Sequence, residues 1–191
     1  MKFFSKSILP WILPFLLFLG FYFLSHGLER TDTLPLLTTY TALFLLLWFW
    51  IRKYSSLGTV LIIGLVCRLL FWNHIPALSQ DFYRFLWDGS IQLLGINPYR
   101  FTPNGLIDLV GFPNAQLLYE KMGSLSNEHY SNYPPLSQYI YRAMGYANHG
   151  DLHGPISVLR GFYLLGEVFL FFGAKALLER LELPSSYLAW Y

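Results

Sequence analysis

The sequence predicts an all-α fold, an integral membrane helical bundle in which one long outer-face loop holds short interfacial helices. Hydrophobic residues make up 54% of the chain and charged residues only 13%, whereas soluble domains carry about 25% charged residues. Four apolar runs have close to the ~20 residues that cross a bilayer core. The segment between the third and fourth runs, residues 74–155, instead mixes aromatic, polar and turn-forming residues.

Residues 1–73 are predicted to form three transmembrane helices. Lys2 and Lys6 precede the first apolar run, as basic residues do in a signal peptide. However, the run is longer than a signal peptide's apolar core, and no small-residue cleavage site follows it. We therefore interpret the first run as a retained membrane anchor. The three runs are residues 8–24, 34–51 and 57–72.

The distribution of lysine and arginine predicts the orientation of these helices. Lys2 and Lys6 precede the first run, and Arg52 and Lys53 lie between the second and the third. Short cytoplasmic connections are enriched in lysine and arginine. The N-terminus is therefore expected inside, and residues 74–155 outside.

The fourth apolar run, residues 156–178, predicts a fourth transmembrane helix that returns to the inside. Residues 179–191 end as a further apolar segment is starting. We therefore expect these residues to be the start of a truncated continuation and the chain to be the N-terminal part of a longer protein.

Residues 74–155 are too long for a plain connector, so we expect them to be functional or independently structured. Gly, Asn and Pro are frequent in "GINPYRFTPNG" and "SNYPPLSQ", which indicates stiff turns. Short helices are expected over 114–125 and 136–150. A longer helix is expected from Ser79, as its N-cap, to Gly95.

The longer helix carries charged and aromatic residues at helical spacing. Asp81, Arg84 and Asp88 lie on one stripe, because residues three, four and seven apart share a helix face. This stripe predicts an amphipathic helix lying in the membrane interface, with its polar side turned toward water or a cavity. Tyr83 and Trp87 form an aromatic pair that is expected at the level of the lipid headgroups.

Two interpretations of the charged stripe stay open. In the first, Arg84 neutralises Asp81 and Asp88 in exposed ion pairs, each contributing about 0.3–0.5 kcal/mol. In the second, one carboxylate stays free to act as a base or to align an acceptor hydroxyl. Asp81 is the better candidate for that role, because it opens the helix, where the helix dipole favours negative charge. Asp88 lies deeper in the helix and is expected to pair with Arg84.

Charged side chains inside apolar runs are costly and usually face a cavity, a partner or a polar ligand. Arg68 lies in the third run and Glu167 in the fourth. Arg68 either extends its charge toward the interface or binds an anionic lipid phosphate, and both interpretations stay open. Arg160, near the outer end of the fourth run, is interpreted as reaching the interface.

Several other functions are not indicated by the sequence. A net charge of +2 without a run of lysine or arginine argues against a nucleic-acid partner. The sequence has no glycine-rich loop for a nucleotide phosphate. Two histidines four residues apart occur in "HGDLH" (149–153), but no third ligand accompanies them. We therefore expect neither a metal site nor a cofactor, and the single cysteine, Cys67, excludes a disulfide within the chain.

One stretch of the sequence resembles a motif of a known family. The stretch "LSQDFYRFLWDGSIQLLGINPYRFTP" is similar to the first outer-face motif of bacterial GT-C membrane glycosyltransferases, in particular the polyprenol-phosphate-mannose-dependent mannosyltransferases. That motif reads D-x-Y-R-x-L-W-D-G followed by G-x-N-P-Y, and the family often has a second acidic residue just before the first, where this chain has Gln80. "NYPPLSQ" (132–138) resembles the family's Tyr-Pro-Pro loop, and the resemblance covers residues 57–191. The matching positions of the first motif are Asp81, Tyr83, Arg84, Leu86, Trp87, Asp88, Gly89, Gly95, Asn97, Pro98 and Tyr99.

The resemblance implies a GT-C-like N-terminal part of a membrane glycosyltransferase, which the fragment alone would not complete. Such an enzyme moves a sugar, here expected to be mannose, from a polyprenyl-phosphate carrier to a glycan or glycolipid acceptor. It does so on the outer face of the inner (cytoplasmic) membrane, in contact with the lipid bilayer. Asp81 is implied as the catalytic base. The implied substrate-binding residues are Arg68, Tyr83, Arg84, Trp87, Asp88, Asn97, Tyr99, Tyr133, Pro134 and Pro135.

Two alternatives from other classes stay open beside the enzyme. One is a non-catalytic membrane scaffold subunit that binds a partner through its aromatic outer segment. The other is a lipid-carrier transporter, with Arg68 and Glu167 lining its path.

Overall fold

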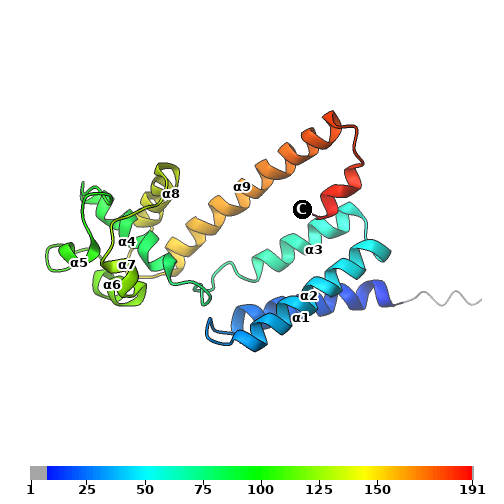
Figure 1. Ribbon diagram of the computed structural model, residues 1–191, viewed down its shortest axis with the longest axis horizontal. Coiled ribbons are helices and arrows are strands. Elements are labelled where there is room, and N and C mark those ends of the chain that lie inside the picture. The colour runs from blue at the N-terminus through cyan, green and yellow to red at the C-terminus, as the bar shows by residue number, and fades with distance from the viewer. Residues whose placement is uncertain (1–7, 191) are drawn as a thin grey trace, which may run out of the picture. The chain divides into compact units, whose positions relative to one another are not determined.

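The computed structural model describes residues 8–190, and in that range the regular structure is helical throughout, with no strand (Figure 1). Lys2 and Lys6, on which part of the predicted orientation rests, lie outside the described residues. The chain divides into two compact units. We call the described residues up to Phe71 together with those from Glu167 on the apolar unit, and Trp72–Gly166 the central unit.

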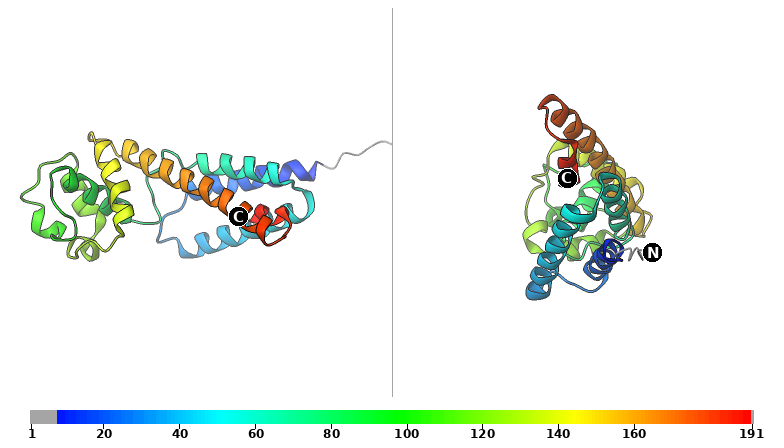
Figure 2. Two further views of the ribbon diagram at one scale, coloured as in Figure 1. Left: turned by 90° about the horizontal axis from the view of Figure 1, so that it is seen from above. Right: turned by 90° about the vertical axis from the view of Figure 1, so that its right-hand side faces the viewer.

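The apolar unit is built from long apolar helices. α1 and α2 lie side by side (Figure 1 and Figure 2) and bury Leu17 and Trp50, each only 1% exposed, between them. Apolar side chains elsewhere on these helices stay exposed, as expected for a surface that contacts lipid. Its elements are α1 (Leu9–His26), α2 (Thr33–Tyr54), α3 (Leu57–Leu69), the second half of α9 (His153–Arg180) and the 3₁₀ helix η1 (Ser185–Trp190).

Three of the described helices, α1, α2 and α9, are long and apolar enough to cross a membrane. The predicted first, second and fourth spans correspond to these helices. The third is shorter than predicted, because α3 ends at Leu69 and has 13 residues. At 1.5 Å per residue it is about 20 Å long, against a bilayer core of about 30 Å.

The central unit contains the predicted short helices and adds one single-turn helix, α5. The helix predicted over 114–125 is α6 followed by α7, and the one predicted over 136–150 is α8. Around α4 the core gathers apolar side chains from α6, α8 and the start of α9. The elements are α4 (Asp81–Leu93), α5 (Pro103–Leu106), α6 (Ala115–Met122), α7 (Ser124–Asn127), α8 (Pro135–Tyr146) and the first half of α9.

α4 and α8 cross at two glycines. A Cβ atom on Gly89 would lie 1.8 Å from the carbonyl oxygen of Tyr141, and one on Gly145 would lie 2.7 Å from the carbonyl oxygen of Gly89. Both clashes are with backbone atoms, which cannot rotate away. The two glycines therefore permit the backbones of α4 and α8 to touch, and this contact fixes the centre of the unit.

The position of α4 corrects one prediction. We expected an amphipathic helix lying in the membrane interface, with Trp87 at the headgroup level. Instead Trp87 is fully buried, with its ring 5.1 Å from that of Phe112 and 6.4 Å from that of Tyr119. Arg84 and Asp88, on the polar stripe, are buried as well. α4 is the central helix of a packed unit, because other segments of the chain cover its polar stripe.

Both ends of α4 follow from local sequence. At the start, the Ser79 hydroxyl accepts a hydrogen bond from the Asp81 amide at 3.2 Å, although the N-cap position is Gln80. At the end, Gly95 has a positive φ of 77°, and the amide of Ile96 donates to the carbonyl of Ile91 at 3.0 Å. This is the Schellman pattern, in which a left-handed glycine closes the helix. It turns the chain into the segment that begins at Asn97.

Candidate functional site

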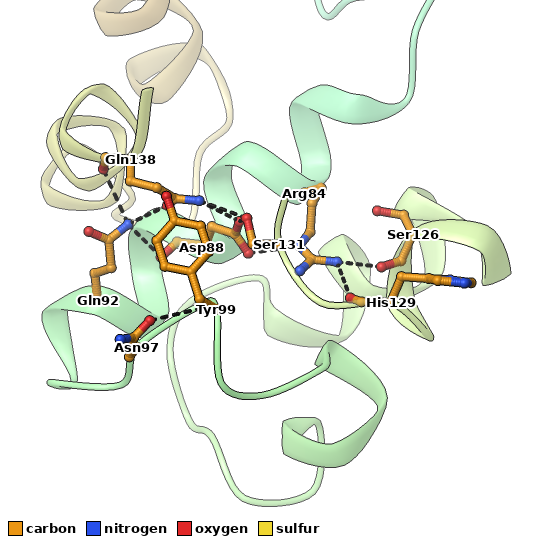
Figure 3. Close-up of polar contacts among 9 residues, drawn as sticks. All are labelled: Arg84, Asp88, Gln92, Asn97, Tyr99, Ser126, His129, Ser131 and Gln138. Atoms are coloured by element: carbon orange, nitrogen blue, oxygen red, sulfur yellow. Dashed lines mark hydrogen bonds and ion pairs between the residues drawn. The ribbon is translucent and has the colours of Figure 1, made fainter. Parts of the chain in front are cut away.

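The centre of the site is a buried ion pair. Arg84 is 3% exposed and Asp88 fully buried, and the Arg84 Nε lies 2.7 Å from Asp88 Oδ1 (Figure 3). The second carboxylate oxygen, Oδ2, accepts from the Ser131 hydroxyl at 2.6 Å and from the Gln138 amide at 3.0 Å. Buried charges persist when they are paired and hydrogen-bonded in this way. The expected pairing of Arg84 with Asp88 is therefore present, but it is buried rather than exposed.

Arg84 also holds the chain on the far side of the ion pair. Its Nη1 donates to the carbonyl of Ser126 and, at 2.9 Å, to that of His129. These carbonyls lie at and just beyond the end of α7, where the last carbonyls of a helix lack partners within it. One arginine thus joins α4 to the segment that leads to Tyr133.

The ion pair extends toward the other end of α4 through two amide side chains. Gln92 donates through Nε2 to the Gln138 side-chain oxygen at 2.8 Å, to the Gln138 carbonyl at 3.2 Å and to the Asp88 carbonyl at 3.1 Å. Below them, Asn97 accepts from the Tyr99 amide at 2.9 Å. The Tyr99 hydroxyl donates to the Tyr133 carbonyl at 2.6 Å. The hydrogen bond from Tyr99 to Tyr133 therefore joins the "GINPY" and "NYPPLSQ" segments directly. Figure 3 shows the hydrogen bonds of Gln92 and Asn97.

Asp81 differs from Asp88 in its exposure and in its lack of hydrogen-bonding partners among the described residues, two properties that make a carboxylate available as a base. It lies exposed on the first turn of α4, and its carboxylate makes no hydrogen bond or ion pair with any residue in the range 8–190. Burial raises the pKa of the nearby Tyr133 phenol, and the negative charge of Asp81 raises it further. Tyr133 thus stays protonated at neutral pH beside a free carboxylate.

Tyr133 and two further aromatic rings pack together as a wall. The Phe85 ring stacks on Tyr141 with centroids 4.5 Å apart, and Tyr133 meets both edge-on at 4.9 and 5.6 Å. Burial raises the pKa of Tyr141 and, on the same helix as Phe85, that of Tyr83. The wall is therefore uncharged at neutral pH, and it fixes the backbone at Tyr133.

A cleft opens at the opposite end of α4 from Asp81. It has a volume of about 310 Å³ and lies between the turn after α4 and the exposed side of α8. Asn97, Tyr99 and Pro135, three of the predicted substrate-binding residues, line this cleft. Its other lining residues are Gln92, Gly95, Ile96, Pro98, Gln138, Tyr139 and Arg142.

Arg68 belongs to the apolar unit and forms an ion pair with Glu167 there. Their side chains are 42% and 39% exposed. Neither of the two interpretations offered for Arg68 named Glu167 as its partner. Since the two charges neutralise each other, a lipid phosphate would have to compete with Glu167 for Arg68.

The predicted site residues therefore fall into three groups. Arg84, Asp88 and Trp87 are buried, so in this structure they support the site rather than face a ligand. Tyr83, Asn97, Tyr99, Tyr133, Pro134 and Pro135 are at least partly exposed, and so is Asp81. Arg68 lies in the other unit.

Sequence reasoning did not single out Ser131, Gln138 or Arg142. Ser131 and Gln138 flank "NYPPLS". Buried Asp88 needs hydrogen-bond donors, and this need points to such neighbours once burial is known. Among the described residues, no group of three or more His, Cys, Asp or Glu could hold a metal ion.

Comparison with protein-family models, with curated proteins and with solved structures finds no match for this chain.

Proposed function

We propose that this protein is a membrane glycosyltransferase of the GT-C type, which moves a sugar from a polyprenyl-phosphate carrier to a glycan or glycolipid acceptor at the outer face of the membrane. The observation that carries the proposal is the contrast between two carboxylates on one helix. Asp88 is saturated by Arg84, Ser131 and Gln138. Asp81, at the exposed start of the same helix, is free within the described residues.

In the proposed reaction an acceptor hydroxyl attacks the anomeric carbon of the carrier-linked sugar. The new bond forms as the bond from that carbon to the phosphate oxygen breaks, and the lipid phosphate leaves with the electron pair. Asp81 takes the hydroxyl proton as general base, a contribution of typically 10²- to 10⁴-fold to such reactions. The membrane helices favour a donor carried by lipid, because it can reach the site by diffusion within the bilayer.

The buried ion pair has a positioning role in this proposal. Arg84 is held by Asp88 and by two carbonyls, so we do not assign it to the leaving phosphate. It keeps the segment before Tyr133 in place on α4, and catalysis needs reacting groups held in a defined geometry.

The test is replacement of Asp81 by asparagine, which removes the base and keeps the shape. Membranes from cells that express the protein are supplied with radiolabelled polyprenyl-phosphate-mannose, and label transferred to endogenous acceptors is measured. Asp81→Asn is expected to lower transfer at least hundredfold with unchanged membrane insertion. Asp108→Asn is the matched control, because Asp108 is an exposed carboxylate in the same unit.

The second candidate is a non-catalytic scaffold subunit. The central unit exposes large apolar side chains, with Leu109 at 79%, Leu125 at 78% and Leu136 at 74%, and exposed apolar patches can mark interaction sites. If Asp81→Asn transfers label as well as the unaltered protein, Asp81 is not the base. If membranes with the unaltered protein transfer no more label than membranes without it, the enzyme proposal fails and the scaffold moves ahead. The transporter is less favoured, since Arg68 and Glu167 pair with each other.

A further inference from the structure

The cleft at the end of α4 carries a positive charge and is lined by no acidic side chain of the described residues, and Asp88 behind it is paired with Arg84. Arg142 lines the cleft, and none of the described residues that line it is Asp or Glu. Within residues 8–190 the guanidinium has one recorded interaction, with the Tyr146 ring at 6.0 Å. Arginine presents a planar set of donors that matches carboxylate and phosphate groups. The cleft therefore favours an anion.

Two amide groups in the cleft are fixed in orientation and have unused hydrogen-bonding atoms. Gln92 donates to three acceptors through its nitrogen, which leaves its Oε1 as an acceptor with no partner in the described chain. Asn97 uses its oxygen to accept from the Tyr99 amide, which leaves its NH₂ group as a donor. A site with both a fixed acceptor and a fixed donor suits hydroxyl groups, which can play either role.

The remaining lining adds aromatic surface and limits the size of the ligand. The Tyr99 side chain is 40% exposed and that of Tyr139 71%, so both offer apolar surface to the cleft that they line. Burial, with the charge of Asp88, raises the pKa of Tyr99, which keeps that phenol neutral. A volume of about 310 Å³ lies at the lower end of the ~300–1,000 Å³ of ligand pockets. One sugar ring with a substituent is the natural occupant.

We propose that this cleft binds a single sugar residue that carries an anionic substituent, a carboxylate or a phosphate. Arg142 binds the anion, Gln92 and Asn97 bind ring hydroxyls, and Tyr99 or Tyr139 covers the apolar face of the ring. In the proposed transfer reaction this ligand is part of the acceptor glycan, a role that depends on the proposed function. The binding itself does not depend on it. Asp81 and Gln92 are eleven residues apart on α4, about 16 Å at 1.5 Å per residue, so an acceptor seated here must extend along the helix to reach Asp81.

The test measures binding without any donor. The full chain in lipid nanodiscs is titrated with glucuronate, glucose 6-phosphate, glucose and inorganic phosphate. Binding of the sugars is followed by saturation-transfer NMR of their protons, and binding of inorganic phosphate, which has no carbon-bound proton, by broadening of its ³¹P signal. At least one anionic sugar is expected to bind at least tenfold more tightly than glucose and than inorganic phosphate. Comparison of glucuronate with glucose 6-phosphate tells which anion the cleft takes.

Arg142→Gln is expected to weaken that binding at least tenfold, whereas Arg100→Gln leaves it unchanged. Arg100 is the matched control, because it is an exposed arginine of the same unit that does not line the cleft. Equal binding of glucose, equal binding of inorganic phosphate, equal effects of the two substitutions, or no binding of any probe would each overturn the proposal. If Asp81→Asn retains both transfer and probe binding, glycosyl transfer through Asp81 is wrong and the binding site stands. If transfer needs Asp81 but no probe binds, the cleft proposal alone is wrong.

Discussion

At the scale of residues, Asp88 is the side chain on which the site depends most. Its two oxygens accept from Arg84, Ser131 and Gln138, which come from α4, from the loop before Tyr133 and from α8. Removal of one partner from a buried ion pair costs about 3–5 kcal/mol, because the other charge is left uncompensated. Asp88 therefore supports the arrangement of three segments at once.

Asp88→Asn is accordingly expected to loosen the central unit. About 3 kcal/mol corresponds to a hundredfold change in an equilibrium constant, since 1.4 kcal/mol is tenfold. Backbone amides of α4 and α8 are expected to exchange with deuterium at least hundredfold faster in the full chain, as measured by mass spectrometry. Asp151→Asn, at an exposed position of the same unit, serves as the control. Unchanged exchange in α4 and α8 would mean that the ion pair does not hold the unit together.

Some of these residue interactions were predictable from the sequence. The i, i+4 spacing of Arg84 and Asp88 predicted their pairing, and the position of Asp81 at the helix start favoured it as the carboxylate that stays free. Burial of the pair was not predictable, because its other partners, Ser131 and Gln138, lie 43 and 50 residues further on in the sequence. Arg142 lines the cleft only because α8 packs on α4.

At the scale of elements, the crossing of α4 and α8 decides where every site residue lies. The helices themselves were predictable, because capping residues, prolines and apolar periodicity are local signals. The environment of α4 was not, because a polar stripe looks the same in a sequence whether water or other polar side chains cover it. In the sequence, Gly89 and Gly145 look like residues that weaken a helix. Only the structure shows that glycine at these positions lets the backbones of α4 and α8 touch.

Substitutions at these glycines are expected to have graded effects. In Gly89→Ala the new methyl group would lie 1.8 Å from a backbone oxygen, and in Gly145→Ala 2.7 Å from one, so the helices must separate. Overpacking usually costs about 1–3 kcal/mol and occasionally more, and Gly89→Ala is expected at or beyond the upper end. Gly111→Ala is the control, because its Cβ would meet nothing within 4 Å. The rate of hydrogen exchange in α8 of the full chain should be lowest in Gly111→Ala, higher in Gly145→Ala and highest in Gly89→Ala. Equal rates in the three variants would contradict the close contact between α4 and α8.

At the scale of the whole molecule, the side of the membrane on which the central unit lies depends on α3. The helix has 13 residues, about 20 Å at 1.5 Å per residue, and must be helped across a core of about 30 Å by bilayer thinning or by its flanking residues. Arg52 and Lys53, at the end of α2, favour a cytoplasmic connection before α3. If α3 crosses, the central unit is outside and the end of α9 inside. If it does not, both positions are reversed.

Labelling of single cysteines in cells separates these two arrangements. In a Cys67→Ser background, Asp108→Cys reports on the central unit and Glu179→Cys on the end of α9, and both positions are exposed. Since the lysines and arginines favour the first arrangement, a membrane-impermeant maleimide is expected to label position 108 in intact cells. Position 179 should be labelled only after permeabilisation. The reverse pattern would place Asp81 in the cytoplasm, where a carrier-linked sugar displayed on the outer face cannot reach it, and the proposed reaction would then need a donor on the inner face.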